Sequence, residues 1–298
     1  MKRIAAFTIV ALTIGLTSCF YFGTCFEGEG MIMTETRSVQ DFTSVNNTGF
    51  FEVYVTQADS FSVRVSAQEN LLGLVETTVS GNTLIVKTKD NTCIRTSLPV
   101  TVEVSMPQIE QLTLSGSGSL STEYAEGESL EISLSGSGRM YVDTLITPEL
   151  LIVHSASGKI YNDLVVSDEA TFYLSGSGTI DAGRIDGENF AVNHSASGSV
   201  LIGELTAVKV NCNLTGSGRI EVAGAADEGH YVNSASGKID ALDLEVKDCT
   251  ATASGSGSIL LFATDFLEAN VLGSGSILYT GDPEITYYRA GTGELRRY

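Results

Sequence analysis

Ser115-Gly-Ser-Gly118 and Ser135-Gly-Ser-Gly138 open a series of four-residue tags of small residues, and this series decides the fold. The tags begin 18 to 20 residues apart, and the last two are degenerate. A constant period of this length indicates a solenoid, in which each repeat is one structural unit stacked on the next. The tags are Ser115–Gly118, Ser135–Gly138, Ser155–Gly158, Ser175–Gly178, Ser195–Gly198, Thr215–Gly218, Ser234–Gly237, Ser254–Gly257, Leu272–Gly275 and Ala290–Gly293.

Apolar residues alternate with polar or small ones in the segment before each tag, as in Leu130, Ile132 and Leu134 around Glu131 and Ser133. A period of two is strand geometry with one buried face. If the first tag residue is position 0, position +5 is aliphatic in every copy, and a third apolar point follows near +9 or +10. Each repeat therefore predicts two strands and a third short one, joined by corners.

Twenty residues are too few for a strand–helix–strand unit, which needs about 30. Three extended segments of about 3.3 Å per residue, with corners, close one coil, and stacked coils pair identical strands in parallel about 4.8 Å apart. Right-handed winding is the rule for parallel crossovers. We therefore predict an all-β fold: a single-stranded right-handed parallel β-helix with about 20 residues per coil and an N-terminal β cap. A leucine-rich-repeat horseshoe has a similar period, but its asparagine ladder is missing from these repeats.

The tags are interpreted as structural corners. Glycine adopts positive φ at little cost, which suits a sharp corner, and small residues let successive corners stack closely. A phosphate-binding loop is disfavoured because such loops precede a helix and no helical pattern follows the tags. Calcium-binding nonapeptide repeats need Asp within the glycine run, and the tags contain none.

The N-terminus has the features of an export signal. Lys2 and Arg3 precede an apolar run from Ile4 to Leu16, which is too short to span a membrane. The Leu16-Thr-Ser-Cys19 sequence that ends this run resembles the bacterial lipobox, which implies cleavage before Cys19 and acylation of that cysteine. The alternative is ordinary secretion with a free Cys19. We expect a signal peptide over 1–18, a lipidated tether over 19–37, a β cap with the first coils over 38–110, and the β-helix over 111–298.

The formal charge of the 298-residue chain is −19, and it becomes −21 once Lys2 and Arg3 are removed. This sign argues against nucleic acid as a partner, since phosphate backbones favour basic proteins. It also argues against electrostatic binding to anionic lipid, so the expected membrane contact is through N-terminal acyl chains alone. The sequence implies no cofactor and does not define an oligomeric state.

Four cysteines remain after Cys19. Cys212 and Cys249 fall at inward positions two coils apart, about 9.6 Å by strand spacing, which exceeds the usual Cα separation in a disulfide. We predict that both are buried free thiols. Cys25 and Cys93 could pair in an oxidising compartment, and the sequence leaves this open.

The segment from Phe42 to Leu114 lacks visible tags but contains strand patterns. Residues 51–55 and 61–65 alternate and are interpreted as a hairpin or neighbouring strands. Residues 69–75 suggest a short helical turn, residues 80–82 a turn before a strand, and residues 99–104 another strand. The aromatic and basic C-terminus, from Tyr287 to Tyr298, is expected to close the last coil.

The order of these segments resembles a known family. Phe42-Thr-Ser-Val, Phe51-Glu-Val-Tyr-Val, Glu69-Asn-Leu-Leu and Gly81-Asn-Thr-Leu-Ile-Val lead into serial Ser-Gly-Ser-Gly coils. This arrangement, over roughly residues 38–298, resembles the "head GIN domain" family of putative auto-transporter adhesins, which is common in Bacteroidetes. The resemblance implies a β-helical, exported, often lipid-anchored protein of the bacterial cell envelope, and it supplies no catalytic residues.

His154 and His194 occupy position −1, where other coils carry Leu, and Asn233 follows at the same place. The histidines are two coils apart, too far to share one zinc ion with bonds of about 2 Å. The preferred interpretation is a polar group satisfied by the adjoining corner; a metal or catalytic role is the alternative.

One outward patch is the candidate binding site. Arg139 and Lys159 occupy position +4 of adjacent coils, and Tyr141 and Tyr161 occupy position +6. Stacked like charges cost free energy, which a bound anion or sugar acid would offset; solvated side chains are the simpler alternative. Arg219 and Lys238 share position +4 but lie beside carboxylates, and we interpret them with Glu221 and Asp240 as an ion network.

Two functional hypotheses follow. The first is a lipid-anchored, non-enzymatic β-helix of the envelope that acts as an adhesin or binding scaffold for a glycan or a protein surface. The second is a polysaccharide-binding or polysaccharide-degrading envelope protein, which is a fold-level analogy. The acidic residues are scattered, and no general acid and base pair can be assembled from the sequence. The prediction is therefore that the protein is not an enzyme; a purely mechanical role in the periplasm is a third possibility.

Overall fold

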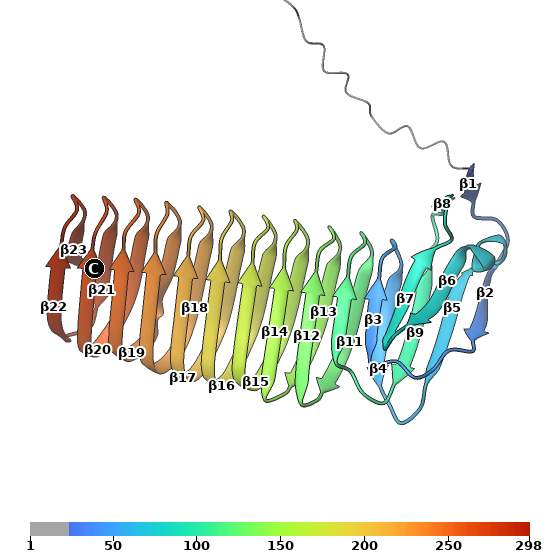
Figure 1. Ribbon diagram of the computed structural model, residues 1–298, viewed down its shortest axis with the longest axis horizontal. Coiled ribbons are helices and arrows are strands. Elements are labelled where there is room, and N and C mark those ends of the chain that lie inside the picture. The colour runs from blue at the N-terminus through green and yellow to red at the C-terminus, as the bar shows by residue number, and fades with distance from the viewer. Residues whose placement is uncertain (1–23) are drawn as a thin grey trace, which may run out of the picture.

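The computed structural model describes residues 24–298 and shows an elongated β-solenoid with a mixed cap at its N-terminal end (Figure 1). It has about nine turns of about 20 residues, with coils stacked in parallel. The predicted all-β, parallel-coil architecture is confirmed. The predicted signal peptide over 1–18 and the predicted lipid attachment at Cys19 lie outside the described residues. No helix among residues 24–298 has the length and hydrophobicity needed to cross a membrane.

The cap and the first coil contain nine strands and one 3₁₀ turn. Their bounds are β1 Thr24–Glu27, β2 Ile32–Arg37, β3 Ser44–Asn47, β4 Glu52–Gln57, β5 Ser62–Gln68, the 3₁₀ turn Glu69–Leu74, β6 Val75–Ser80, β7 Thr83–Thr88, β8 Thr92–Arg95 and β9 Thr101–Met106.

The remaining strands wrap the solenoid. They are β10 Gln111–Leu114, β11 Ser119–Glu126, β12 Ser129–Leu134, β13 Arg139–Ile146, β14 Glu149–His154, β15 Lys159–Leu174, β16 Thr179–His194, β17 Ser199–Leu214, β18 Arg219–Asn233, β19 Lys238–Ala253, β20 Ser258–Val271, β21 Ser276–Thr280, β22 Glu284–Arg289 and β23 Glu294–Arg297.

Successive coils pair in register at the repeat length. Leu150 lies opposite Leu130 on one neighbour and opposite Ala170 on the other, so equivalent residues form continuous columns. From β15 to β19 each coil is one strand of 15 or 16 residues that bends around the core and is interrupted only at the tag. The third short segment predicted from sequence is therefore continuous with its neighbour in these coils.

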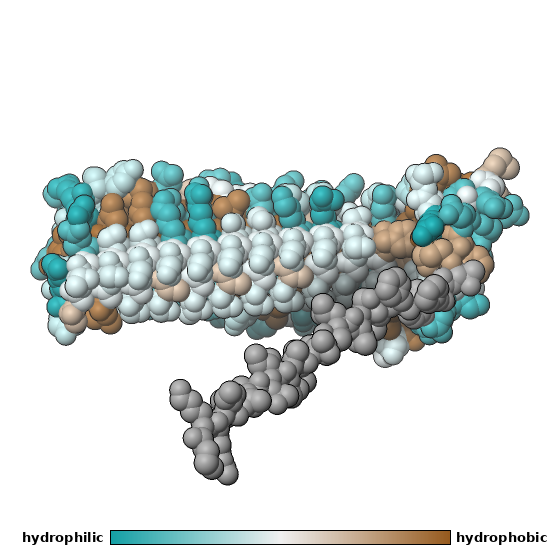
Figure 2. All heavy atoms as spheres, turned by 90° about the horizontal axis from the view of Figure 1, so that it is seen from above, coloured by the Kyte–Doolittle hydropathy of each residue, from teal (hydrophilic) through white to brown (hydrophobic). Residues whose placement is uncertain are grey.

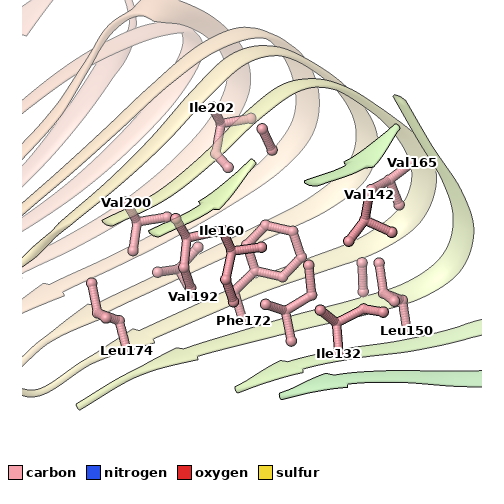
Figure 3. Packing of buried hydrophobic residues seen from close by; sticks show 14 of the residues in the cluster. Ile132, Val142, Leu150, Ile160, Val165, Phe172, Leu174, Val192, Val200 and Ile202 are labelled. Carbon is pink, nitrogen blue, oxygen red and sulfur yellow. The ribbon is translucent and has the colours of Figure 1, made fainter. Parts of the chain in front are cut away.

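Inward columns form one apolar core along the solenoid (Figure 3). Phe172 and Phe190, on adjacent coils, are buried and meet edge to face with ring centroids 5.1 Å apart. Figure 3 shows Phe172 in the interior beside Ile160. Burial of alternating apolar residues, at roughly 25 cal/mol per Å², is the main stabilising contribution.

The tag glycines are required for close stacking and not for positive φ, which corrects the expectation from sequence. Among residues 24–298, positive φ occurs only at Gly30, Gly81, Gly224 and Gly281 among the glycines, and none of these lies in a tag. A Cβ at Gly138 would instead lie 2.1 Å from the carbonyl oxygen of Gly118 in the coil below. The small side chains of the tags form the pale band along the solenoid in Figure 2.

The first coil lies within the segment where no tag is visible. β3 and β4 pair in parallel with β10 and β11, and Ser119 lies opposite Glu52. The register places residues 48–51, Thr-Gly-Phe-Phe, where later coils have a tag. This corner cannot be recognised from the sequence, because Phe50 and Phe51 stand where the later tags have small residues.

The cap differs from expectation in one pairing. β4 and β5 were expected to be a hairpin or neighbours, but β9 lies between them, parallel to β4 and antiparallel to β5. The expected turn after Ser80 joins the antiparallel strands β6 and β7, and the expected helical turn is the 3₁₀ turn Glu69–Leu74. Strands β1 and β8 pair in parallel and carry the disulfide between Cys25 and Cys93.

The C-terminal segment forms the last coil. β22 pairs with β20 and β23 pairs with β21, and within residues 24–298 no strand covers the other edge of either. All six residues of β22 are exposed. These strands therefore extend the solenoid and do not form a separate cap over it.

Candidate functional site

The four predicted patch residues lie together on the outer surface of β13 and β15. Arg139 is the register partner of Lys159, and Tyr141 is the register partner of Tyr161. Arg139, Tyr141 and Lys159 are exposed and Tyr161 is half-buried. The position arises because Met140 and Ile160 between them point into the core, and alternation sends their neighbours outward.

The two tyrosine rings are stacked face to face. Their centroids are 5.2 Å apart and their planes differ by 6°. This separation is close to the spacing of parallel strands, so the stack follows from the register of the two coils. Because each ring covers one face of the other, only the outer faces of the pair and the ring edges with their hydroxyls remain available to a ligand.

The two cations beside the rings have no counter-ion among the residues that the structure describes. Neither Arg139 nor Lys159 forms an ion pair or a side-chain hydrogen bond with another of residues 24–298. Adjacent like charges without a counter-ion repel each other and favour a bound anion.

Arg219 and Lys238 provide an internal comparison at the same coil position. Arg219 pairs with Glu221, and Lys238 pairs with Asp240 at 2.7 Å, while Asp240 also lies 4.0 Å from Arg219. The ion network predicted from sequence is confirmed. Carboxylates stand there at the position that the tyrosines occupy in the patch, so the two sites differ in whether the cations are neutralised.

A column of carboxylates, Glu123, Asp143 and Asp163, lies on β11, β13 and β15 two residues beyond the column of Ser121, Tyr141 and Tyr161. Burial raises the pKa of Asp143, and the nearby charges of Asp163 and Glu123 raise it further. This column repels an anion, so an acidic ligand at the patch would place its charge toward Arg139 and Lys159.

A third tyrosine, Tyr54, lies in the same column as the two predicted tyrosines. The sequence did not predict its place there. Ser121 lies opposite Tyr141 on one side and opposite Tyr54 on the other. Tyr54 is 46% exposed, and its hydroxyl donates to Glu52 at 3.2 Å. Burial, followed by the charge of Glu52 and this hydrogen bond, raises the pKa of Tyr54. The alternation in Phe51-Glu-Val-Tyr-Val indicates that Tyr54 points outward. Its register with the later coils could not be read from the sequence, because the corner of the first coil lacks the tag.

His154 and His194, at position −1, each bond to the adjoining corner, which confirms the interpretation preferred from the sequence. His154 is fully buried; its Nε2 lies 2.8 Å from the carbonyl oxygen of Gly158, and the amide of Ala156 donates to its Nδ1 at 3.4 Å. His194 repeats this arrangement with Gly198 and Ala196. Each ring therefore bridges the two ends of its own tag. Its Nδ1 also lies close to a carbonyl oxygen of the preceding coil, at 3.2 Å from Leu134 for His154 and at 3.0 Å from Leu174 for His194.

Asparagine performs the same task in two other coils. Asn233 donates to the carbonyl oxygen of Gly237 at 2.8 Å and accepts from the amide of Ala235. Asn47 donates to the carbonyl oxygen of Phe51 at 2.8 Å in the first coil. A buried polar residue at position −1 is thus a structural bridge, and the sequence pattern alone did not identify Asn47 as one.

Cys212 and Cys249 are buried free thiols, as predicted. Burial raises the pKa of each to about 12, and the charge of Asp248 adds to the effect at Cys249. Tyr231 is packed in the coil between them, and the missing side chain of Gly229 leaves room for its ring.

Two surface hollows accompany these features. A groove of about 460 Å³ follows the tag face between Ser197 and Ser276 and is lined by serine and glycine with Arg219 and Lys238. A hollow of about 940 Å³ lies where the cap meets the solenoid and is lined by amides and four glutamates, among them Glu110 and Glu126. No group of three or more His, Cys, Asp or Glu residues within 24–298 is arranged to hold a metal ion.

The fold and site define a class: a parallel β-solenoid that presents an unpaired basic and aromatic patch on an acidic surface. The chain belongs to the family described as "putative auto-transporter adhesin, head GIN domain", whose sequence profile matches residues 41–210 and 199–283. The resemblance stated from sequence is confirmed. No curated protein matches the chain.

Two solved structures share the architecture. One is described as a putative adhesin from Parabacteroides distasonis ATCC 8503, with 21% identity, a TM-score of 0.55, and coverage of 92% of this chain and 100% of the other. The second is described as a putative lipid binding protein from the same strain, with 24% identity, a TM-score of 0.50 and the same coverage. At these identities the likeness establishes the fold.

Proposed function

We propose that this protein is an exported, lipid-anchored, non-enzymatic adhesin of the bacterial cell envelope that binds acidic glycans. The family is described as one of putative auto-transporter adhesins, and the sequence before Thr24 supports export and acylation at Cys19. The observation that carries the ligand class is the unneutralised Arg139–Lys159 pair beside the Tyr141–Tyr161 stack.

The chemistry of the patch favours a sugar acid over a neutral sugar. Two adjacent cations repel each other, so a ligand carboxylate or sulfate between them removes a cost that the free protein bears. The outer faces of the stacked phenol pair can contribute apolar contact to the face of a sugar ring. The overall charge of −19 opposes non-specific binding of polyanions, so binding would depend on this local patch.

The proposal is for binding and not for hydrolysis. Glycoside hydrolysis uses a pair of carboxyl groups that flank the scissile bond. The patch offers two cations and two phenols, which recognise a charge and a ring. The same glycans, incubated with the protein, are expected to show no new reducing ends.

A glycan array probed with the purified protein tests this function. We expect saturable binding to uronate-containing or sulfated glycans, and loss of that binding in Arg139→Ala/Lys159→Ala and in Tyr161→Ala. The matched control is Arg219→Ala/Lys238→Ala, which removes the same charges from the same coil position but where they are already paired. Binding that survives loss of the patch cations, or that disappears equally in the control, would refute the proposed site.

A further inference from the structure

The tyrosine column on this face has a gap one residue wide. Along the column, Tyr54, Ser121, Tyr141 and Tyr161 follow one another on adjacent coils. Tyr141 and Tyr161 fill consecutive places with stacked rings. Ser121 leaves the place between Tyr54 and Tyr141 without a ring.

The gap has the dimensions of one ring. Two strand spacings separate Tyr54 from Tyr141, about 9.6 Å. A ring placed midway would lie about 4.8 Å from each tyrosine, within the 4.5–7 Å range of favourable ring stacking. It would also continue the 5.2 Å spacing that the Tyr141–Tyr161 pair already shows.

The walls of the gap are exposed. The Tyr54 and Tyr141 side chains are 46% and 42% exposed, respectively. Tyr161 covers one face of the Tyr141 ring, and because the two planes are within 6° of parallel, the opposite face is turned toward the Ser121 coil.

Polar groups line one side of the gap. On the same strands, two residues earlier, Glu52, Ser119 and Arg139 form the adjacent column. Glu52 is held to the hydroxyl of Tyr54 and can accept from a ligand hydroxyl, whereas Arg139 is unpaired. A ring in the gap would thus meet an acceptor on one coil and a cation on the other.

We propose that the slot between Tyr54 and Tyr141, with Ser121 as its floor, is a subsite that takes one hexuronate ring of an acidic polysaccharide. The faces of the pyranose pack against the two phenol rings, its carboxylate contacts Arg139, and a hydroxyl donates to Glu52. This inference rests on the proposed function and locates one sugar unit within it.

Ser121→Tyr tests the slot directly because the new side chain supplies the missing ring. The variant is expected to fold with a melting temperature equal to or above that of the wild type, since it completes the ladder. Its affinity for size-defined oligogalacturonides, measured by isothermal titration calorimetry, is expected to fall by about tenfold or more, equivalent to about 1.4 kcal/mol. Leu201→Tyr is the matched control, since it adds a tyrosine at the same coil position two coils beyond Tyr161.

A second pair of variants tests one wall without filling the slot. Tyr54→Ala should weaken oligogalacturonide binding by a similar factor, and Tyr54→Phe, which keeps the ring, should preserve most of it. If Tyr54→Ala, or a folded Ser121→Tyr, binds oligogalacturonides with wild-type affinity, the proposed slot is wrong.

The two proposals fail separately. If Arg139→Ala/Lys159→Ala abolishes binding while the slot variants bind normally, the glycan site stands and the slot is wrong. If the cation variants also bind normally, or if the wild type binds neutral maltohexaose as well as oligogalacturonides, the acidic-glycan function itself is wrong.

Discussion

The fourth residue of each tag shows how strongly stacking constrains a single position. A Cβ at Gly178 would lie 2.0 Å from Nε2 of His154 and 2.4 Å from the carbonyl oxygen of Gly158. Neither atom can move without disturbing the coil below, because the ring and the carbonyl are hydrogen-bonded to each other. One methyl group is therefore expected to disrupt two coils.

Gly178→Ala should destabilise the protein by about 3 kcal/mol, the upper end of the usual cost of overpacking. Urea denaturation followed by circular dichroism would measure the change. Gly73→Ala is the control, since nothing lies within 4 Å of a Cβ at that position. Equal stability of the two variants would show that the tags do not require glycine for close approach.

The buried thiols give a residue-scale prediction with a defined pH dependence. Burial raises the pKa of Cys212 and Cys249 to about 12, so at pH 8 about one thiol in ten thousand is ionised. Alkylation by iodoacetamide should be negligible in the folded protein at pH 8 and become rapid after denaturation.

The sign of the linked stability effect follows from the same values. The folded state retains thiol protons that the unfolded chain releases above about pH 9, so stability should fall as the pH rises from about 9 toward 12. A variant without Cys19 isolates the two buried thiols, since Cys25 and Cys93 are joined. Fast alkylation of the folded protein at pH 8 would contradict their burial.

At the scale of the element, the corner exists in two forms. Corners with His154, His194 or Asn233 at position −1 carry Ala at the second tag position, whose amide donates to the polar side chain. Corners with Leu at position −1 carry Gly at that position, and in Gly136 the amide instead donates to the carbonyl oxygen of Leu114 in the coil below. The residue at position −1 and the second tag residue therefore vary together in these tagged coils; in the first coil, whose corner lacks the tag, Asn47 accepts from the amide of Gly49 instead.

Exchange of one corner form for the other tests this coupling. His154→Leu alone leaves the Ala156 amide and the Gly158 carbonyl without their side-chain partner, at a cost of about 1–3 kcal/mol for each group that stays unpaired. His154→Leu/Ala156→Gly recreates the form found at Leu134 and should recover much of the loss. His154→Asn should be tolerated, because Asn233 makes the same contacts. Additive effects in the double variant, measured by thermal denaturation, would show that the two positions are independent.

On the scale of the whole molecule, the solenoid converts spacing in the chain into neighbours in space. Residues 20 apart become adjacent, so the patch and the slot each draw on several coils. The cap contains β1, which begins at Thr24 and is the first described strand after the proposed anchor in the sequence. The patch coils lie close to the cap, and the later coils extend away from it (Figure 1).

The proposed anchor makes a prediction about the complete protein. Cys19→Ser should abolish incorporation of radiolabelled palmitate and release the protein from the membrane fraction into the soluble fraction of expressing cells. Cys25→Ser is the control, because Cys25 lies near the anchor but is committed to a disulfide. Membrane retention of Cys19→Ser would refute acylation, and an impermeant label on intact cells would report which side of the envelope the protein faces.

The sequence alone determined the repeat length, the parallel stacking of coils, the inward residues and the burial of Cys212 and Cys249. These follow from local alternation and a fixed period, which repeat often enough to be unambiguous. It also placed Arg139, Lys159, Tyr141 and Tyr161 side by side, because the tags set their register.

Only the tertiary structure decided the features that depend on contacts between segments without a shared pattern. The pairing of Cys25 with Cys93, the position of β9 between β4 and β5, and the steric role of the tag glycines required the positions of neighbouring backbones. The same holds for the slot, because Tyr54 belongs to a coil whose corner lacks the tag. Its distance from Tyr141 is set by stacking, and no interval along the chain encodes it.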